Sequence, residues 1–380
     1  MKPIPLTLQA FIRNKHYQAQ SWPTRLHLDV PLLVGILLLC ALGLAVLYSA
    51  NGENLAQLQR QLIHLVIALL VMFGVAQVRP SVLRHWSPWV FLLGLLMLVA
   101  VLLFGSTGKG AQRWLYLGIV YFQPSELVKI AVPMMLAWYF ANKPLPPRWP
   151  QLLVASILIT LPVLLIAKQP DLGTSILVAS SGIFVLFLAG ISWRLIVSLF
   201  FLAAAAAPIL WHFFMHDYQR QRVLTLFNPE QDPLGAGYHS IQGKIAIGSG
   251  GIYGKGWFNG TQSQLDFLPE RHTDFIFAVL AEEFGLAGVI VLLLVYLFII
   301  LRGLYIASHA RGTYARLLAG TLTLVFFMYL FVNIGMVTGL LPIVGIPLPL
   351  VSYGGTSLVT LLAGFGILMS IHTNRKLLPH

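Results

Sequence analysis

Apolar runs recur along nearly the whole chain and constrain its fold more than any other feature of the sequence. Many of them are close to the ~20 residues that an α-helix needs to cross a ~30 Å hydrocarbon core. Of the 380 residues, 58% are hydrophobic and only 9% are charged, whereas about 25% of the residues of a soluble domain are charged. The sequence therefore excludes a single soluble globule and predicts an all-α polytopic membrane protein.

The hydropathy pattern predicts about ten transmembrane helices with one long outer loop at about 212–274. The predicted spans are 30–50, 62–78, 89–105, 126–141, 152–167, 174–191, 194–211, 275–301, 315–338 and 356–372. No repeat of fixed period divides the chain. We therefore expect a single membrane domain at 30–376, preceded by an N-terminal cytoplasmic segment at 1–29 and followed by a tail at 377–380.

The basic residues assign an orientation to these helices. If the N-terminus is cytoplasmic, 14 of the 24 lysines and arginines fall in cytoplasmic segments, in agreement with the positive-inside rule. They are Lys2, Arg13, Lys15, Arg25, Arg79, Arg84, Lys143, Arg148, Arg194, Arg302, Arg311, Arg316, Arg375 and Lys376. Of the 12 acids, only Asp29 falls on that side. We therefore expect both termini in the cytoplasm and any chemistry at the outer face.

The net charge of +12 does not indicate a nucleic-acid-binding protein, because the basic residues are dispersed between apolar segments. The run after the first 29 residues lacks the short apolar core and the cleavage site of a signal peptide, so we interpret it as a retained first span. The single cysteine, Cys40, excludes an intramolecular disulfide and a cysteine-rich metal cluster.

The segment at 260–275 holds the highest density of candidate site residues. Asp266, Glu270 and Asp274 lie within nine residues of sequence at the predicted outer membrane boundary. One interpretation is helix capping, in which Thr273 or Asp274 accepts the free amides at the start of the eighth span. The other is that a partly desolvated carboxylate, foremost Asp274, acts as a base.

Charged residues also frame the outer ends of the fourth and sixth spans. Arg113 precedes the fourth span, and Glu126 and Lys129 lie three residues apart at its start, where they can pair on one helix face. Facing the outer leaflet, Arg113 and Lys129 would also attract a lipid phosphate. Asp171, at the start of the sixth span, is either a helix cap or a site residue.

Two further features favour ordinary structural roles. The glycine-rich segment at 248–256 fails the P-loop pattern, because Ser249 and Gly256 stand where that pattern needs a glycine and a hydroxyl residue. We interpret it as a flexible outer loop, and the alternative is that its backbone amides bind an anionic ligand. Glu282 and Glu283 follow inside the eighth apolar run, and we interpret them as a solvated face or a packing pair.

The last outer connection, at 339–355, carries no charge and contains three prolines. It is therefore not an ordinary solvated loop. An irregular apolar connection is tolerated at membrane depth only where it is buried in protein or lines a cavity. We expect it to form a re-entrant segment or the wall of a groove.

Several polar and glycine-containing motifs follow one another along the chain. They are Arg113–Trp114, Gln123–Glu126, Gln169–Thr174, Asp232–Tyr238, Leu268–Phe275 and Pro349–Gly355. Together they resemble the motifs of the SEDS family (shape, elongation, division and sporulation), and the resemblance covers residues from about 30 to 376. The run at 260–264 resembles the rod-shape members of that family rather than its cell-division members.

The resemblance implies a glycosyltransferase of the bacterial cell inner membrane, which polymerises lipid II into β-1,4 glycan strands during cell elongation and rod-shape maintenance. It implies an active site on the periplasmic side. The implied partners are a class B penicillin-binding transpeptidase, further membrane proteins of the elongation complex and the surrounding membrane lipid. Two other functions stay open, namely a lipid II flippase and a noncatalytic scaffold for the transpeptidase.

Family function places the essential acid at Asp274 and its supporting acid at Asp266. The residues implied for binding the substrate and its diphosphate are Arg113, Glu126, Lys129, Asp171, Arg220 and Arg222. A divalent cation can also hold the diphosphate, and the sequence identifies no ligands for one. The chain departs from the family pattern at Asp266, where relatives often carry Glu, and at Tyr116 and Tyr121, where they often carry Asp and Arg.

Overall fold

The computed structural model describes residues 26–52, 55–108, 111–116, 118, 121–209, 211–212, 215, 217–229, 236–265, 267–268 and 270–374. Its helices are α3 (Val30–Ala50), α4 (Leu55–Ala76), α5 (Pro80–Phe104), α6 (Pro124–Phe140), α7 (Trp149–Ala167), α8 (Leu172–Leu188), α9 (Trp193–Ile209), α10 (Asp217–Phe227), α11 (Ala236–Ser249), α12 (Thr261–Gln264), α13 (Ile276–Ser308), α14 (Gly312–Thr338) and α15 (Thr356–Thr373). A small antiparallel sheet of β1 (Ser106–Gly108), β2 (Ala111–Tyr116) and β3 (Tyr121–Phe122) separates α5 from α6.

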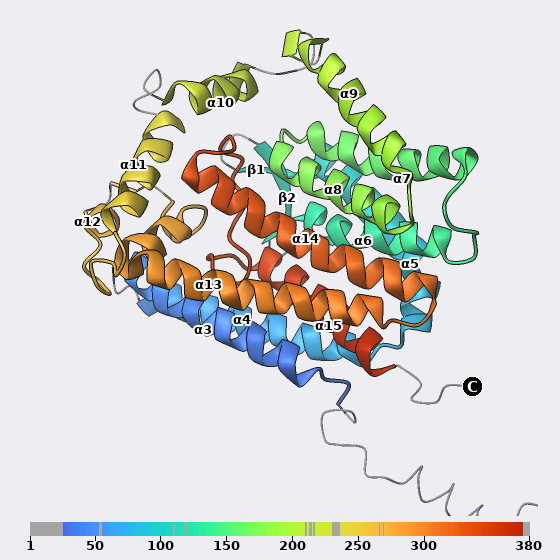
Figure 1. Ribbon diagram of the computed structural model, residues 1–380, viewed down its shortest axis with the longest axis horizontal. Coiled ribbons are helices and arrows are strands. Elements are labelled where there is room, and N and C mark those ends of the chain that lie inside the picture. Colours follow the sequence, from blue (N-terminus) through green and yellow to red (C-terminus); the bar gives the residue numbers. More distant parts are fainter. Residues whose placement is uncertain are drawn as a thin grey trace, which may run out of the picture.

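The helices pack into a bundle around α13 and α14, which lie side by side across the molecule in Figure 1. On one flank α3 packs against α13 and α4 packs against α15, whereas α6 and α8 contact α14 on the other. α9 leans out of the bundle, and α10 and α11 carry the chain back toward the end where α13 begins (Figure 1). The start of α13 and the end of α14 therefore lie at the same end of the bundle.

Helix starts follow signals that are visible in the sequence. The Asp29 side chain caps α3 by accepting a hydrogen bond from the backbone N–H of Leu32 at 2.9 Å. Asp171 caps α8 in the same way, with the N–H of Thr174 at 3.2 Å. Pro124 begins α6, at a position where its missing N–H removes no helical hydrogen bond. These local signals fix where three helices of the bundle begin.

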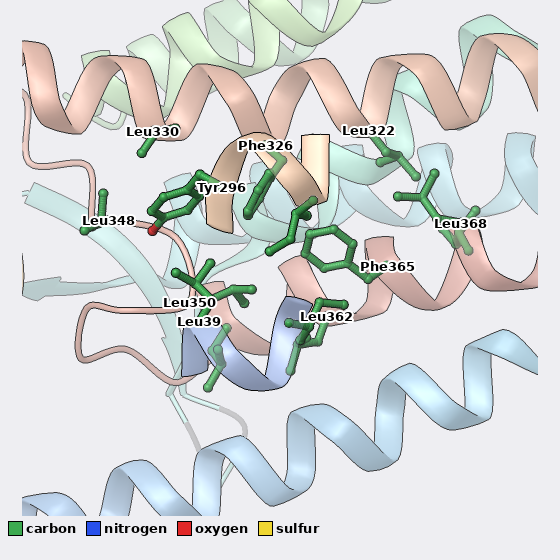
Figure 2. Packing of buried hydrophobic residues seen from close by; sticks show 14 of the residues in the cluster. Leu39, Tyr296, Leu322, Phe326, Leu330, Leu348, Leu350, Leu362, Phe365 and Leu368 are labelled. Atoms are coloured by element: carbon green, nitrogen blue, oxygen red, sulfur yellow. The ribbon is translucent and has the colours of Figure 1, made fainter. Parts of the chain in front are cut away.

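The hydrophobic core includes the uncharged segment at 339–355. Figure 2 shows Leu348 of this segment in one buried cluster with Tyr296 of α13 and Phe326 of α14. The Tyr296 hydroxyl also donates to the carbonyl of Pro349 at 2.6 Å. The part at Leu348–Ser352 is buried in protein, as expected of an irregular connection at membrane depth, whereas Leu340 is 77% exposed. A re-entrant segment or the wall of a groove stays a prediction.

Each of the ten predicted spans corresponds to a helix, although several helices extend beyond their apolar run. α4 begins at Leu55 instead of 62, α5 begins at Pro80 instead of 89, and α13 continues to Ser308 instead of 301. Hydropathy detects only the apolar part of a helix, so polar end turns escape it. In the described part of the chain, seven helices (α3, α4, α5, α7, α13, α14 and α15) are long and apolar enough to cross a membrane, and α8 is a shorter apolar helix. The polytopic helical class is confirmed, and the number of crossings stays a prediction.

Two regions contain secondary structure outside the ten predicted spans. The sequence does not predict the sheet, because its longest strand has only six residues and so carries little periodic signal. The outer loop at about 212–274 contains α10, α11 and α12 and is therefore folded. The segment at 1–25 and the tail at 375–380 lie outside the described residues.

The orientation can be tested with single cysteines in a Cys40→Ala background. A cysteine at Tyr253, which is 85% exposed in the outer loop, is expected to react with an impermeant maleimide on intact cells. A cysteine at Ser308, at the exposed end of α13, is expected to react only after the cells are permeabilised. Labelling at Ser308 but not at Tyr253 in intact cells would overturn the orientation and with it the outer location of the site.

Candidate active site

Asp274 lies directly before α13, at the end of the bundle that is predicted to face outward. The N-cap of α13 is Phe275, and no side chain caps this helix, so the interpretation of Thr273 or Asp274 as a cap is wrong. The Asp274 side chain is half-buried, and a methyl group added to Gly345 would come within 3.3 Å of its Oδ2. Gly345 has a φ of 73°, a conformation that favours glycine. The carboxylate therefore lies against glycine backbone.

The segment at 339–355 holds the backbone just before the aspartate. Oγ of Ser352 donates to the carbonyl of Thr273 at 2.5 Å. The N–H of Tyr353 donates to the carbonyl of His272 at 2.9 Å. The residues that lead into Asp274 are therefore fixed to a buried part of the core.

Asn333 of α14 fixes the aspartate itself. Its Nδ2 donates to the carbonyl of Asp274 at 2.9 Å and to the carbonyl of Ile346 at 2.7 Å. Asn333 is fully buried, and burial of an amide is costly unless it is hydrogen-bonded. One side chain thus joins α14, the start of α13 and the 339–355 segment, and it keeps the backbone of Asp274 in place.

Arg113 and Asp171 form a second polar group, although they lie far apart in the sequence. Nη2 of Arg113 donates to the carbonyl of Pro170 at 2.6 Å, and its Nε lies 3.6 Å from Oδ2 of Asp171. Gln123 donates to the same carboxylate oxygen at 3.2 Å. Asp171 is therefore a helix cap that also orients Arg113.

Glu126 and Lys129 form the predicted i,i+3 pair, with Nζ 2.7 Å from Oε1. Lys129 also donates to the Tyr329 hydroxyl and lies over the Tyr329 ring, 4.8 Å from its centroid. Both charged side chains are buried, because α6 and α14 enclose them. The expectation that Lys129 faces the outer leaflet is therefore wrong, and a role of Lys129 in binding a phosphate stays a prediction.

Two short connections join these polar groups. Tyr329 and Asn333 lie one turn apart on α14 and share a helix face. At the start of α8, a methyl group on Gly173 would come within 2.9 Å of the carbonyl of Val344, the neighbour of Gly345. The site residues that the structure brings to this end of the bundle are Asp274, Arg113, Asp171, Glu126 and Lys129.

Glu282 and Glu283 anchor the outer loop to the bundle. Both are fully buried, so the interpretation as a solvated face is wrong. Glu282 accepts hydrogen bonds from Nζ of Lys255 at 2.8 Å and from the N–H of Gln262 at 3.0 Å, whereas Glu283 accepts one from Ser49 of α3. Adjacent helical residues point about 100° apart, so each carboxylate serves a different element.

The glycine-rich segment at 248–256 fills a break in α13. The helix is interrupted at Gly285, which has a φ of 63° and a ψ of −161°. The N–H of Leu286 donates to the carbonyl of Gly251 at 2.9 Å. At Gly254 an added methyl group would collide with the backbone of α13. The segment is therefore a packed partner of the broken helix, and its interpretation as a flexible loop is wrong.

The remaining predicted residues do not join the site in the described part of the chain. Arg220 of α10 donates to the carbonyls of Trp211 and His212 at 2.8 and 3.0 Å, so the turn after α9 occupies much of its guanidinium. Arg222 lies on the same helix, which Figure 1 places apart from α6 and α8. Asp266 lies outside the described residues. Roles for these three residues stay predictions.

Among the described residues, no three His, Cys, Asp or Glu side chains gather as a metal site. The His239 ring stacks on Phe275 with a centroid distance of 5.9 Å. The His272 ring meets Tyr353 edge-on at 6.3 Å. Both histidines therefore pack against the residues that frame the aspartate.

Tyr116 and Tyr121, the two positions where the chain is expected to depart from the family pattern, lie on neighbouring strands of the small sheet. They face each other across β2 and β3, and their ring centroids are 5.1 Å apart. Cross-strand aromatic pairs stabilise a sheet by roughly 0.2–1 kcal/mol. An aromatic contact therefore joins β2 and β3.

The sequence does not single out Tyr329, Asn333 or Gly345. A signal for the first two exists, because a polar residue inside an apolar span needs a buried partner and these two lie one turn apart at 315–338. Gly345 has no such signal, since its importance comes from contact with a residue distant in sequence.

Fold and site together define a polytopic helical membrane protein in which the site residues Asp274, Arg113, Asp171, Glu126 and Lys129 lie at one end of the bundle. The family model FTSW_RODA_SPOVE, described as "Cell cycle protein", matches residues 29–377. The chain belongs to this family, which confirms the resemblance drawn from its motifs.

Individual relatives cover nearly the whole chain. The peptidoglycan glycosyltransferase MrdB of Escherichia coli strain K12 is 57% identical over 354 residues, which span 93% of this chain and 96% of MrdB. The probable peptidoglycan glycosyltransferase FtsW of Geobacter metallireducens is 36% identical, over 92% of this chain and 96% of that protein.

Solved structures agree with this assignment. A chain from a study of the structural coordination of polymerization and crosslinking by a peptidoglycan synthase complex has a TM-score of 0.79 and 35% identity, over 90% of this chain and 97% of that one. The crystal structure of the rod shape determining protein RodA of Thermus thermophilus has a TM-score of 0.70 and 30% identity, over 91% and 97%.

Proposed function

We propose that the chain is an inverting peptidoglycan glycosyltransferase, which polymerises lipid II into β-1,4 glycan strands during cell elongation and rod-shape maintenance. The names of the relatives MrdB and FtsW support this activity. The observation that carries the proposal is the setting of Asp274. Its half-buried carboxylate lies against Gly345, and Asn333 and Ser352 hold the backbone on either side of its peptide unit. A carboxylate held in this way is preorganised to accept a proton.

In the proposed reaction, Asp274 takes the proton from the 4-hydroxyl of the acceptor's N-acetylglucosamine while that oxygen attacks the donor's anomeric carbon. The bond from this carbon to the diphosphate breaks, and undecaprenyl diphosphate leaves with the bonding electrons. The α-linked diphosphate becomes a β-1,4 link. This inversion needs one base and stabilisation of the leaving group, without a covalent enzyme intermediate. Asp266 is proposed to support the base.

Arg113 is the described side chain best suited to meet the diphosphate. A guanidinium carries five N–H donors, and one of these is used at the carbonyl of Pro170. Asp171 orients the group, and 31% of the Arg113 side chain stays exposed. Lys129, by contrast, is enclosed with Glu126. We therefore assign the buried pair to holding α6 against α14 and Arg113 to the leaving group.

We place this site at the periplasmic face of a bacterial inner membrane, with both termini in the cytoplasm. The placement is supported by the positive-inside distribution of the basic residues. It is also supported by the clustering of Asp274, Arg113 and Asp171 at one end of the bundle. A transporter would be expected to place such charges near the midplane of the membrane.

The proposed activity is tested with the purified full-length chain and labelled lipid II. Formation of a ladder of glycan strands is the expected result. Transbilayer movement of lipid II without any ladder would contradict the enzyme and support the flippase. Neither activity, with the transpeptidase still bound, would support the scaffold.

A class B penicillin-binding transpeptidase is proposed as the partner, together with further membrane proteins of the elongation complex. The family relative in a synthase complex that coordinates polymerization and crosslinking supports this pairing. We expect the transpeptidase to copurify with the chain and to raise the rate of ladder formation. Equal polymerisation with and without a bound transpeptidase would remove activation from the proposal.

A further inference from the structure

The short helix α12 is capped by a carboxylate that belongs to α13. Gly260, the N-cap residue of α12, has no side chain with which to cap it. Instead, Oε1 of Glu282 accepts a hydrogen bond from the N–H of Gln262 at 3.0 Å, and Oε2 accepts one from the N–H of Ser263 at 3.3 Å. N–H groups at these positions are the ones that an N-cap side chain usually satisfies. Glu282 therefore fixes the start of α12 to α13.

Two further groups pair with the buried carboxylate of Glu282. Nζ of Lys255 lies 2.8 Å from its Oε1 and also donates to the Thr261 hydroxyl at 2.7 Å. That hydroxyl in turn donates to Oε1 of Glu282 at 3.2 Å. A buried ion pair is tolerated when its geometry is good and further hydrogen bonds satisfy both partners. One carboxylate thus joins α12, α13 and the glycine-rich segment at 248–256.

The two capped residues also hold the stretch of chain that leads to Asp274. The carbonyl of Gln262 accepts a hydrogen bond from the N–H of Leu268 at 3.2 Å, and Leu268 is 2% exposed. The carbonyl of Ser263 accepts one from Nη1 of Arg271, which precedes Asp274 by three residues. Gln262 and Ser263 therefore bond to α13 through their N–H groups and to the residues before Asp274 through their carbonyls.

Asp274 is therefore held from two sides. On the core side, Asn333 and the 339–355 segment bond to the backbone at 272–274. On the loop side, α12 holds the residues that precede it. Glu282 is 0% exposed and has no surface for a substrate, so it can act on the reaction only through the elements that it joins.

We propose that Glu282 is a positioning residue of the glycosyl transfer. Through α12 it sets the place of the segment that ends at Asp274, and it contacts no reacting group. The inference rests on the proposed function, in which the Asp274 carboxylate accepts the proton of the acceptor hydroxyl. A misplacement of about 1 Å can cost a reaction roughly 100-fold in rate. Loss of the cap is therefore expected to slow the bond-forming step more than it weakens substrate binding.

Glu282→Ala tests this role in the purified full-length chain. The protein is loaded with a labelled lipid-linked glycan strand and mixed with saturating lipid II, so that the rate constant of extension reports bond formation and the amplitude reports the fraction of competent protein. We expect the rate constant to fall at least about tenfold and the KM for lipid II to stay within about twofold. A lower amplitude with an unchanged rate constant would reduce Glu282 to a folding residue and overturn the proposal.

Glu283→Ala is the matched control. Glu283 is the neighbouring residue of α13, is 1% exposed and accepts a hydrogen bond from Ser49 of α3. The same atoms are removed as in Glu282→Ala, but the cap of α12 is kept. Extension is therefore expected at close to the wild-type rate constant. An equal loss of rate constant in both variants would assign the effect to any buried acid of α13 and overturn the specific role of Glu282.

A second substitution can restore the cap from within α12. Gly260 has a φ of −68° and a ψ of 108°, an extended conformation of the kind that N-cap residues adopt. A methyl group added to it would come within 3.0 Å of Oε2 of Glu282. In Glu282→Ala/Gly260→Asp, the carboxylate at 260 therefore replaces the lost one beside the N–H groups of Gln262 and Ser263. Most of the lost rate constant is expected to return, and a double variant as slow as Glu282→Ala would contradict a role through α12.

Amide hydrogen exchange separates this inference from the proposed function. In Glu282→Ala the amides of Gln262, Ser263 and Leu268 are expected to exchange at least about tenfold faster than in the wild type, whereas those of α14 keep their protection. Unchanged exchange would mean that other contacts hold α12, and it would overturn the positioning role whether or not the chain polymerises lipid II. A wild type that forms no glycan ladder would contradict the proposed function, and the exchange result would still decide whether Glu282 holds α12.

Discussion

Asp274→Asn is expected to lower the rate of glycan formation at least about 100-fold, the usual worth of a positioned base. Asparagine keeps the size of the side chain but cannot accept the proton of the acceptor hydroxyl. The variant is expected to stay folded, because Asp274 caps no helix and Asn333 holds it through its backbone carbonyl. The measurement is the ladder assay on purified protein of verified melting temperature.

Glu270→Gln serves as the control for this result. Glu270 lies in the same segment and accepts a hydrogen bond from the Thr273 hydroxyl at 2.9 Å, which an amide oxygen can also accept. We expect Glu270→Gln to polymerise lipid II at close to the normal rate, and Asp266→Asn to be milder than Asp274→Asn. A folded Asp274→Asn protein with a normal rate would refute the base.

Lys129→Met is expected to lower the free energy of unfolding by about 3–5 kcal/mol, the usual cost of leaving one member of a buried ion pair without its partner. The carboxylate of Glu126 would stay buried between α6 and α14 with its 2.7 Å contact removed. In Glu126→Gln/Lys129→Met no uncompensated charge remains, so most of the lost stability is expected to return. Denaturant unfolding of the wild type, Lys129→Met, Glu126→Gln and the double variant in one detergent measures this cycle.

Tyr329→Phe measures the contribution of Tyr329, which contacts Lys129 of the buried ion pair. It removes only the hydroxyl that accepts from Lys129, and we expect a loss of about 1.5–3 kcal/mol in the free energy of unfolding, the usual result for a hydrogen bond to a charged group. If the double variant were no more stable than Lys129→Met alone, the pair would not be coupled, and burial of Glu126 would need another explanation.

The sequence predicts those parts of the fold that depend on local properties. Apolar length locates the helices, because the bilayer requires it. The cap at Asp171 and the pair of Glu126 with Lys129 follow from spacings of three residues, which any helix brings onto one face. The lack of charge at 339–355 predicts a buried connection for the same reason, since only protein can satisfy its backbone there.

Contacts between distant segments could not be predicted in this way. Arg113 meets Asp171 only because the sheet after α5 packs beside the start of α8, and no periodicity encodes that packing. Glu282 and Glu283 of α13 stand in an apolar stretch of sequence. That stretch does not indicate that their partners are Lys255 and Ser49, which lie on different elements. Asp274 itself was found through its local charge density and the family motif, whereas its contact with Gly345 required the fold.

The segment at 339–355, which packs beside Asp274, restricts how this protein can be regulated. Its backbone accepts a hydrogen bond from Asn333 of α14 at the carbonyl of Ile346 and donates one from the N–H of Gly354 to Oε1 of Gln61 of α4 at 3.3 Å. A movement of this segment would break such hydrogen bonds in an apolar interior. Each polar group left unsatisfied would cost roughly 1–3 kcal/mol of free energy. A bound transpeptidase is therefore expected to act on the outlying arch of α9, α10 and α11 (Figure 1). The transpeptidase would then change the rates of substrate binding and product release, whereas the rate constant of the bond-forming step would stay the same.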